Sequence, residues 1–250
     1  MEYKVSDNIR LFLMNNIDFM KTIPDNYYSI GITDIPYGIN VGKMAFVKET
    51  KTLVRQKNGS LMNPNKKKKL QPCEWDNKIP DIEWWNEFKR ITKHQIFFGV
   101  DYVNWEDLGT GRIKWNKGFA EGMSFSKYET AYCSFIDYTH EIDYLWAGMM
   151  QGRSKVNPMV QQGNKRLNEI REHPSQKPII LWDLILDFCF EKNIMIENVV
   201  DTFCGLCSLS ISCDKIGGVK FDGVDITKDY IDKSLKRIQT YLSTKNTLFD

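Results

Sequence analysis

Histidine is scarce in this chain, and its six cysteines do not form a set of metal ligands. The only histidines are His94, His140 and His173, and none lies at ligand spacing from the pair Cys204 and Cys207. A structural zinc site would need a second cysteine pair or nearby histidines. Because no secretory signal is evident, we expect reduced thiols, with a metal or redox role for the pair as the weaker interpretation.

Long apolar stretches are also missing. No run approaches the roughly 20 apolar residues that a membrane-spanning helix requires. The N-terminus carries Glu2, Lys4 and Asp7 instead of a signal-peptide pattern. We therefore expect a cytoplasmic protein without a membrane partner.

Aromatic residues, in contrast, are plentiful. Seven Trp, eleven Tyr and fourteen Phe residues and an apolar fraction of 42% exclude a disordered chain. A chain of 250 residues is long enough to bury a sizeable core as one α/β domain. We expect a single domain, residues 1–250, that contains one long insertion.

The formal net charge of +2 hides an uneven distribution. Residues 41–72 contain eight Lys and one Arg against the single acid Glu49, so they carry +8 and the remainder carries −6. A basic loop on an acidic body is typical of proteins that bind a polyanion. A solvated loop that keeps the protein soluble is the alternative. The candidates for contact with a polyanion in this loop are Lys66, Lys67, Lys68 and Lys69.

The hydrophobic pattern predicts strands and helices in alternation. Strands are expected at residues 9–14, 28–33, 95–100, 112–116, 129–136, 199–203 and 219–224. Helices are expected from Asn15 or Asn16 to before Pro24, at 81–92, 178–190 and 208–216, and from Thr227 onward. This order is typical of a doubly wound, mostly parallel α/β sheet. The pattern weakens from residue 140 to 171, a mildly basic stretch.

The first candidate site follows the strand at 28–33. There the chain reads Asp34-Ile35-Pro36-Tyr37, and Pro36 cannot donate a ladder hydrogen bond, so the strand ends. Ligands of open α/β sheets bind outside the carboxyl ends of the strands. An acid, a rigid turn and an aromatic ring are thus expected at a binding edge, although the same residues also serve as ordinary turn residues.

A second candidate site is the glycine turn at residues 201–207, Asp-Thr-Phe-Cys-Gly-Leu-Cys. Asp225 ends the next strand, where a carboxylate can accept both hydroxyls of a ribose. Asp201 suits a ligand's ammonium group or, alternatively, the capping of the following helix. Such a turn occurs in many folds, because only one glycine of a Gly-x-Gly pair is present.

In combination, these motifs resemble those of the amino-group DNA methyltransferases of the permuted, β-type order, whose catalytic half precedes the cofactor-binding half. Residues 34–39 resemble the family's Asp-Pro-Pro-Tyr motif, and 173–178 (His-Pro-Ser-Gln-Lys-Pro) resemble its His-Pro-Thr-Gln-Lys-Pro segment. Residues 201–208 resemble its Asp-x-Phe-x-Gly-x-Gly turn. Shorter matches follow in the family's order at 23–26, 74–76, 97–99 and 115–117.

The resemblance implies a Rossmann-like, S-adenosylmethionine-dependent methyltransferase that acts on double-stranded DNA. The implied target is N6 of adenine, with N4 of cytosine as the alternative. The catalytic half would be residues 1–136, including the basic loop 41–72, and the cofactor-binding half residues 172–250. Residues 137–171 would form the target-recognition region. A homodimer is left open.

The resemblance also implies residue roles. Asp34 and the Ile35 carbonyl would accept the two amino hydrogens of a flipped base, Pro36 would shape the turn, and Tyr37 would hold the base. The implied cofactor-binding residues are Asn15, Ser175, Lys177, Asp201, Phe203, Gly205 and Asp225. The implied DNA-binding residues are the four lysines 66–69, Arg153 and Lys155. No metal is implied.

Two departures from the family pattern lie in these motifs. Ile35 replaces the first proline but keeps the carbonyl acceptor, and Cys207 replaces the second glycine, which adds a side chain where the backbone approaches the cofactor. Two rival functions follow. A non-catalytic DNA-binding member of the fold would bind duplex without cofactor. A nicotinamide-dependent oxidoreductase would use Asp225 and the glycine turn but gives no role to Asp34.

Overall fold

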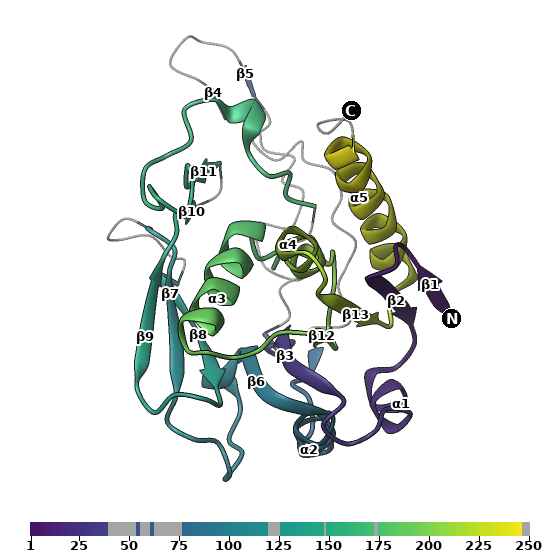
Figure 1. Cartoon of the computed structure of the whole chain (residues 1–250). Coiled ribbons are helices and arrows are strands. Elements are labelled where there is room, and N and C mark those ends of the chain that lie inside the picture. Colours follow the sequence, from purple (N-terminus) through teal and green to yellow (C-terminus); the bar gives the residue numbers. More distant parts are fainter. Residues whose placement is uncertain are drawn as a thin grey trace.

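The computed structural model describes residues 1–39, 54–55, 61–62, 77–119, 126–147, 149–172 and 175–246. Its main feature is a nine-stranded sheet in the order β1-β2-β13-β12-β3-β6-β8-β7-β9 (Figure 1). The strands are β1 (Glu2–Lys4), β2 (Ile9–Leu13), β3 (Tyr28–Asp34), β6 (Thr92–Phe98), β7 (Arg112–Asn116), β8 (Tyr128–Cys133), β9 (Thr139–Asp143), β12 (Asn198–Asp201) and β13 (Lys220–Asp225). Two short strands, β4 (Val54–Arg55) and β5 (Leu61–Met62), pair separately.

The sheet is mostly parallel, as the sequence predicts. The five central strands β2, β13, β12, β3 and β6 run parallel to one another. Strand β8 lies antiparallel between β6 and β7, and β1 is antiparallel at the other edge. The strand β3 is buried along its length up to Asp34, which is half-buried at its carboxyl end.

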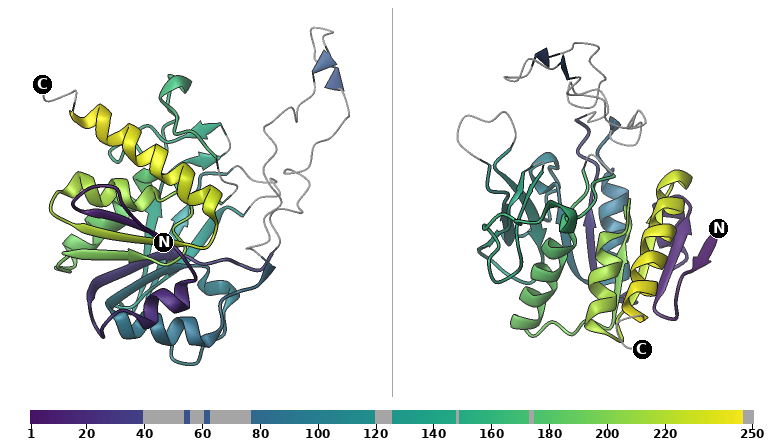
Figure 2. Two further views of the ribbon diagram at one scale, coloured as in Figure 1. Left: turned by 90° about the vertical axis from the view of Figure 1, so that its right-hand side faces the viewer. Right: turned by 90° about the horizontal axis from the view of Figure 1, so that it is seen from above.

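Helices cover both faces of the sheet. Helices α1 (Asn16–Lys21) and α2 (Ile82–Ile91) pack together on one face, and α3 (Ile179–Glu191), α4 (Ser208–Ile216) and α5 (Lys228–Asn246) cover the other (Figures 1 and 2). The helix α2 buries Trp84, Trp85, Phe88 and Ile91, a spacing of three and four residues that gives one apolar face. The doubly wound arrangement is thereby confirmed.

The arrangement of the two central strands creates a crevice. The chain leaves β12 through α4 toward β13 on one side, and it leaves β3 through α2 toward β6 on the other. The connections that leave these two neighbouring strands therefore run in opposite directions along the sheet. Their carboxyl ends mark the topological switch point, where ligands of open α/β sheets bind. Asp34 and Asp201 are the last residues of the two strands.

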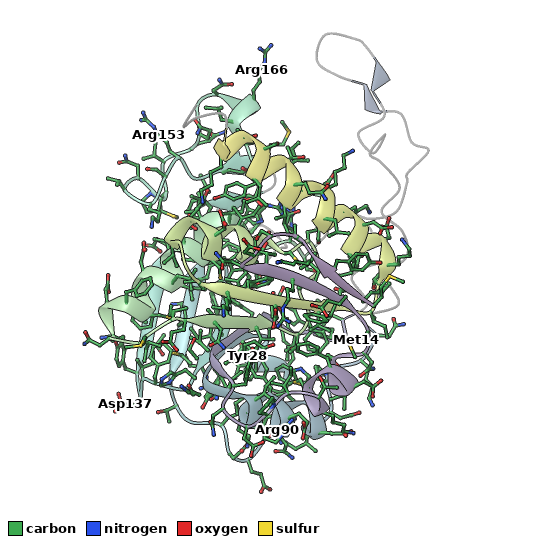
Figure 3. All side chains as sticks on the ribbon, turned by 45° about the vertical axis from the view of Figure 1, so that its right-hand side comes forward. Met14, Tyr28, Arg90, Asp137, Arg153 and Arg166 are labelled. Carbon is green, nitrogen blue, oxygen red and sulfur yellow. The ribbon has the colours of Figure 1, made fainter. Side chains whose placement is uncertain are left out.

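The expected target-recognition region 137–171 divides into two parts. Its first part contains β9, which pairs in parallel with β7 at the edge of the main sheet. The hairpin of β10 (Trp146–Ala147) and β11 (Met150–Gln151), together with the segment that follows, lies outside that sheet. Arg153 and Arg166 project outward from this segment (Figure 3).

The five helices named above are short or strongly polar. Within the described part of the chain, none has the length and apolar character required to cross a lipid bilayer.

Candidate functional site

A cavity of about 260 Å³ opens at the carboxyl ends of β3 and β12. Every residue expected to act in catalysis or cofactor binding lines it: Asn15, Asp34, Ile35, Pro36, Tyr37, Ser175, Lys177, Asp201, Phe203, Gly205 and Asp225. Residues from both ends of the sequence thus meet in one cavity. Its wall also includes Met14, Trp182, Ile226 and Tyr230, which the motifs do not identify.

The turn after β3 is held by close packing. Ile35 is buried, and its amide donates to the Phe98 carbonyl at 3.3 Å, which closes the ladder with β6. Gly99 has a φ of +97°, and a Cβ atom there would lie 2.7 Å from Tyr37 Cε1 and 2.8 Å from Ile35 Cγ1. The turn therefore depends on a residue without a side chain at position 99.

Tyr37 faces the acids of the site with its hydroxyl group. The Tyr37 Oη atom lies 2.7 Å from Asp34 Oδ1 and 3.1 Å from Glu129 Oε2. Burial, together with these two carboxylates, holds the pKa of Tyr37 well above its ordinary value, so the hydroxyl stays protonated and donates. The ring stacks on Tyr102, with centroids 4.7 Å apart and planes at 10°. Its expected contact with a base stays a prediction.

Lys177, which the sequence places among the cofactor-binding residues, lines the cavity and also contacts two acids. Its contact with a cofactor stays a prediction. It is only 5% exposed, and its Nζ atom lies 2.6 Å from Asp34 Oδ2 and 2.9 Å from Glu129 Oε2. Burial works against its charged form, but the two carboxylates outweigh this effect and raise the pKa of Lys177. Lys177 thus lines the cavity as the counter-ion of the candidate catalytic acid.

Glu129 and Lys117 complete a cluster of four charges with Asp34 and Lys177. Lys117 Nζ lies 3.0 Å from Glu129 Oε1, on the side of the carboxylate away from Lys177. Burial opposes ionisation of Glu129, yet the two lysines outweigh it and lower the pKa of Glu129 to about 2. Burial raises the pKa of Asp34, and Lys177 offsets only part of this rise. Two acids and two bases balance, which burial of such groups requires.

The sequence motifs identify Lys117 only as part of a Trp-Asn-Lys match and do not identify Glu129. Glu129 lies in β8, opposite Trp115 of β7, and the two residues are 14 positions apart in the chain. A carboxylate in an otherwise half-apolar strand is the only local signal. Its proximity to Asp34 arises from the pairing of β8 with β6 and cannot be seen locally.

Asp201 is buried and closes its own turn. Its Oδ1 atom accepts hydrogen bonds from Thr33 Oγ1 at 2.6 Å and from the Phe203 amide at 3.1 Å. Burial raises its pKa to about 7, more than these bonds lower it. The carboxyl group caps the turn that precedes α4 and lines the cavity at the same time.

Asp225 ties two backbone turns together. Its Oδ2 atom accepts from the Gly205 amide at 3.0 Å, and its Oδ1 atom accepts from the Thr227 amide at 2.7 Å. Burial raises its pKa to about 6 despite these bonds. Gly205 has a φ of +49°, and a Cβ atom there would meet nothing within 4 Å, so the backbone angle alone favours glycine.

Cys207 corrects one expectation. Its φ is +50°, a backbone angle that glycine adopts readily. Its side chain is fully buried in the core and does not line the cavity. The thiol therefore does not narrow the space where a ligand would approach the turn. Burial also raises the pKa of Cys204 well above its ordinary value. Among the described residues, no group of three or more potential ligands could hold a metal ion.

Asn15 and Phe203 have structural contacts as well as places in the cavity wall. Asn15 Oδ1 caps α1 by accepting from the Ile17 and Asp18 amides at 2.8 and 3.3 Å. The Phe203 ring packs against Trp84, with centroids 5.6 Å apart. Phe203 thus packs in the core and lines the cavity at the same time.

Only some of the residues expected to contact DNA lie in the described part of the chain. Residues 41–72, which the sequence predicts to form a basic loop, lie outside the described residues apart from β4 and β5, and this includes the four lysines 66–69. Arg153 is exposed on the segment after β11 (Figure 3). Lys155 pairs with Asp187 of α3 at 2.5 Å, so its charge is partly neutralised within the protein.

No protein-family model and no curated protein sequence matches this chain. Several solved structures are similar in backbone. M1.HpyAVI is 15% identical, with a TM-score of 0.47 over 92% of this chain and 98% of its own. The M1.HpyAVI–SAM complex is 14% identical, with a TM-score of 0.47 over 92% and 99%. The cytosine-N4-specific PvuII DNA methyltransferase is 11% identical, with a TM-score of 0.46 over 92% and 86%. At this level of similarity, function must be inferred from the site itself.

Proposed function

We propose that this protein is an S-adenosylmethionine-dependent DNA methyltransferase that modifies the N6 amino group of adenine. The observation that carries the proposal is the single cavity that joins the Asp34 turn to the glycine turn and Asp225. One part supplies acceptors for an amino group, and the other supplies groups that suit a nucleoside with a positive charge. Both parts were identified from sequence motifs about 170 residues apart.

The residues of the glycine turn fit the chemistry of S-adenosylmethionine. Asp201 offers a buried carboxyl group to an ammonium group, and Asp225 offers a carboxylate to ribose hydroxyls. Phe203 and Ile226 offer apolar surface to an adenine ring. Burial raises the pKa of both acids because it disfavours uncompensated negative charge in the cavity, and a cationic ligand would offset this effect. When bound, this cofactor supplies an electrophilic methyl group.

The Asp34 turn would make the target nitrogen nucleophilic. The lone pair of an exocyclic amino group is delocalised into the ring, so the free group attacks poorly. Asp34 and the Ile35 carbonyl can accept its two hydrogens and favour a tetrahedral nitrogen, and Asp34 can take up the proton that the nitrogen releases after transfer. Holding the two reactants in line supplies much of the remaining acceleration.

The choice of adenine rests on Asp, in place of Ser, at the first position of the motif. N4 of cytosine is the second candidate, because the same two acceptors would serve its amino group. The segment after β11 and the basic residues 41–72 are the proposed DNA contacts. The cytoplasmic location expected from the sequence stays a prediction, and a homodimer stays open.

The most direct test is single-molecule sequencing of DNA from cells that express the protein. We expect N6-methyladenine in one sequence context and none in cells that express Asp34→Ala. Modification at N4 of cytosine would show that the target base is cytosine, while the proposed methyl transfer to an amino group would stand. Absence of any modified base, with purified protein that binds duplex but not S-adenosylmethionine, would favour the non-catalytic DNA-binding rival. Calorimetry with NAD tests the oxidoreductase rival.

The catalytic role of Asp34 makes a separate prediction. Asp34→Ala should lower the rate of methyl transfer by about 10²- to 10⁴-fold, the range for loss of a positioned proton acceptor. Binding of S-adenosylmethionine should be largely kept, because Asp201 and Asp225 stay in place. Asp34→Asn is the matched variant, since it keeps the size and one acceptor oxygen but loses the charge. Full activity of Asp34→Ala would overturn this role.

A further inference from the structure

Two groups in the cavity bridge the carboxylates of Asp34 and Glu129. Lys177 Nζ lies 2.6 Å from Asp34 Oδ2 and 2.9 Å from Glu129 Oε2. The Tyr37 hydroxyl lies 2.7 Å from Asp34 and 3.1 Å from Glu129. Lys177 and Tyr37 are the side chains that bond to the Asp34 carboxylate within the described part of the chain. Both also contact a second acid, which comes from β8, a strand outside the motifs.

This sharing matters because a buried ammonium group would otherwise pair fully with Asp34. A carboxylate in a close ion pair is a weaker proton acceptor, since the cation stabilises its charged form. Glu129 competes for Lys177 at nearly the same distance. Its remaining oxygen is held by Lys117 at 3.0 Å, which keeps Glu129 ionised and fixed on the far side of Lys177.

We propose that Glu129 is a positioning residue that holds Lys177 between two carboxylates, so that Asp34 stays available to accept a hydrogen from the target amino group. The inference rests on the proposed function and adds a residue to it. Lys117 acts behind Glu129 as its second counter-ion. The four-charge cluster thus sets both the place and the basicity of Asp34.

Other charged groups face the same cluster. Arg171, which follows the β10–β11 segment, interacts electrostatically with Glu129, and Asp201 of β12 interacts with Asp34. Asp201 disfavours ionisation of Asp34, as Glu129 does, because it carries a charge of the same sign. Lys177 and Lys117 favour ionisation. Loss of the charge on Glu129 and loss of the charge on Lys117 should therefore shift the pKa of Asp34 in opposite directions.

The test measures the pH dependence of kcat in two variants. Glu129→Gln is nearly isosteric with the wild-type side chain, and Lys117→Gln shortens the lysine side chain. Glu129→Gln removes a negative charge near Asp34, so the acid limb of the profile should move to lower pH. Lys117→Gln removes a positive charge, so the limb should move to higher pH. Glu129→Gln should also lower kcat by about tenfold or more, because Lys177 then pairs only with Asp34. Its KM for S-adenosylmethionine should not change.

Two further variants separate positioning from simple support of the fold. Glu129→Asp keeps the charge and should restore part of kcat and the original acid limb. Glu141→Gln is the matched control, because Glu141 of β9 pairs with Lys114 of β7 at 3.0 Å in the same part of the sheet but on the exposed surface. It should leave both kcat and the profile unchanged.

A wild-type acid limb and kcat in Glu129→Gln would overturn the inference. If Glu129→Gln does not fold, Lys117→Gln and Glu129→Asp still decide it. Simple support of the fold predicts neither a shift to higher pH in the first variant nor recovery of the acid limb in the second. Carbon-13 NMR titration of the Asp34 carboxyl group in wild type and Lys117→Gln needs no activity. Inactive wild-type protein would overturn the proposed function, whereas an unshifted Asp34 titration would overturn the role of the cluster.

Discussion

At the scale of single residues, Asp201 shows how burial adapts a carboxyl group to a cationic ligand. Its pKa rises from 3.8 to about 7 on folding, mainly because burial disfavours the charged form. As pH rises, the unfolded chain therefore loses the Asp201 proton at lower pH than the folded protein does. Between about pH 4 and pH 7 the unfolded state binds fewer protons than the folded state, so this group makes the free energy of unfolding fall as pH rises, and its effect levels off above pH 7.

Binding of S-adenosylmethionine should offset the unfavourable ionisation of buried Asp201. The ammonium group favours ionised Asp201, so affinity should increase with pH up to about pH 7, by at most about tenfold per pH unit, and binding should release protons. Calorimetry in two buffers with different ionisation enthalpies measures this release. Asp201→Asn should remove the part that titrates near pH 7 and leave the part from Asp225, whose pKa is about 6. An affinity that is independent of pH from 5 to 8 would contradict the ammonium contact.

Cys207 shows what residue type alone can and cannot predict. A motif that expects glycine at this position correctly indicates a left-handed backbone, and the structure has a φ of +50° there. The direction of the side chain depends on how α4 packs on the sheet, which the local sequence does not specify. The thiol is buried in the core, so the crowding expected at the cofactor turn is absent from the described cavity wall.

At the scale of elements, the end of β6 supports the end of β3. Gly99 follows β6, and a Cβ atom there would overlap both Tyr37 and Ile35. We predict that Gly99→Ala lowers kcat by about tenfold or more, because it displaces the turn that carries Asp34. It should also destabilise the protein by about 1 to 3 kcal/mol, since φ at this position is positive. Methyl-transfer kinetics and chemical denaturation measure the two effects.

Gly217 offers a matched control for that experiment. It also has a positive φ, +81°, but a Cβ atom there would meet nothing within 4 Å. Gly217→Ala should lose a similar amount of stability to backbone strain while kcat stays unchanged. Equal losses of kcat in both variants would show that strain, and not displacement of Tyr37, accounts for the effect at Gly99.

Elements with a strong hydrophobic period could be predicted from the sequence. The predicted strands and helices begin and end within three residues of those observed, because each carries a continuous, alternating or helical pattern of apolar residues that is buried in the core. Strand β9 was not predicted, since as an edge strand it buries only Ile142. The β10–β11 hairpin was missed because two-residue strands carry no period. Glu129 was missed for a different reason, since its role depends on strand order.

At the scale of the whole molecule, charge is distributed between the body and the proposed DNA contacts. The residues outside 41–72 carry a net charge of −6, so as a whole they repel a polyanion. Local groups of basic residues must therefore supply the attraction to DNA. The segment after β11 presents Arg153 and Arg166 at the surface (Figure 3). These arginines and the lysines of the loop are therefore expected to supply most of the electrostatic attraction.

This attraction should appear in the salt dependence of duplex binding. The slope of log K against log salt concentration changes by about 0.9 for each phosphate contact. Replacing Lys66, Lys67, Lys68 and Lys69 together by Gln should reduce the slope by up to about four such contacts. A slope that does not change in this variant would contradict the proposed role of the loop.

Arg153 and Lys155 form a sharper pair for the same measurement, because they lie two residues apart and differ in their partners. Lys155 is paired with Asp187 at 2.5 Å, so its ammonium group already has a counter-ion in the free protein and displaces fewer ions from DNA. Arg153→Gln should therefore reduce the slope by about one contact, and Lys155→Gln by clearly less. Asp187→Asn should release Lys155 and steepen the slope. Equal effects of the two single substitutions would show that position alone, and not pairing with α3, sets the contribution of each charge.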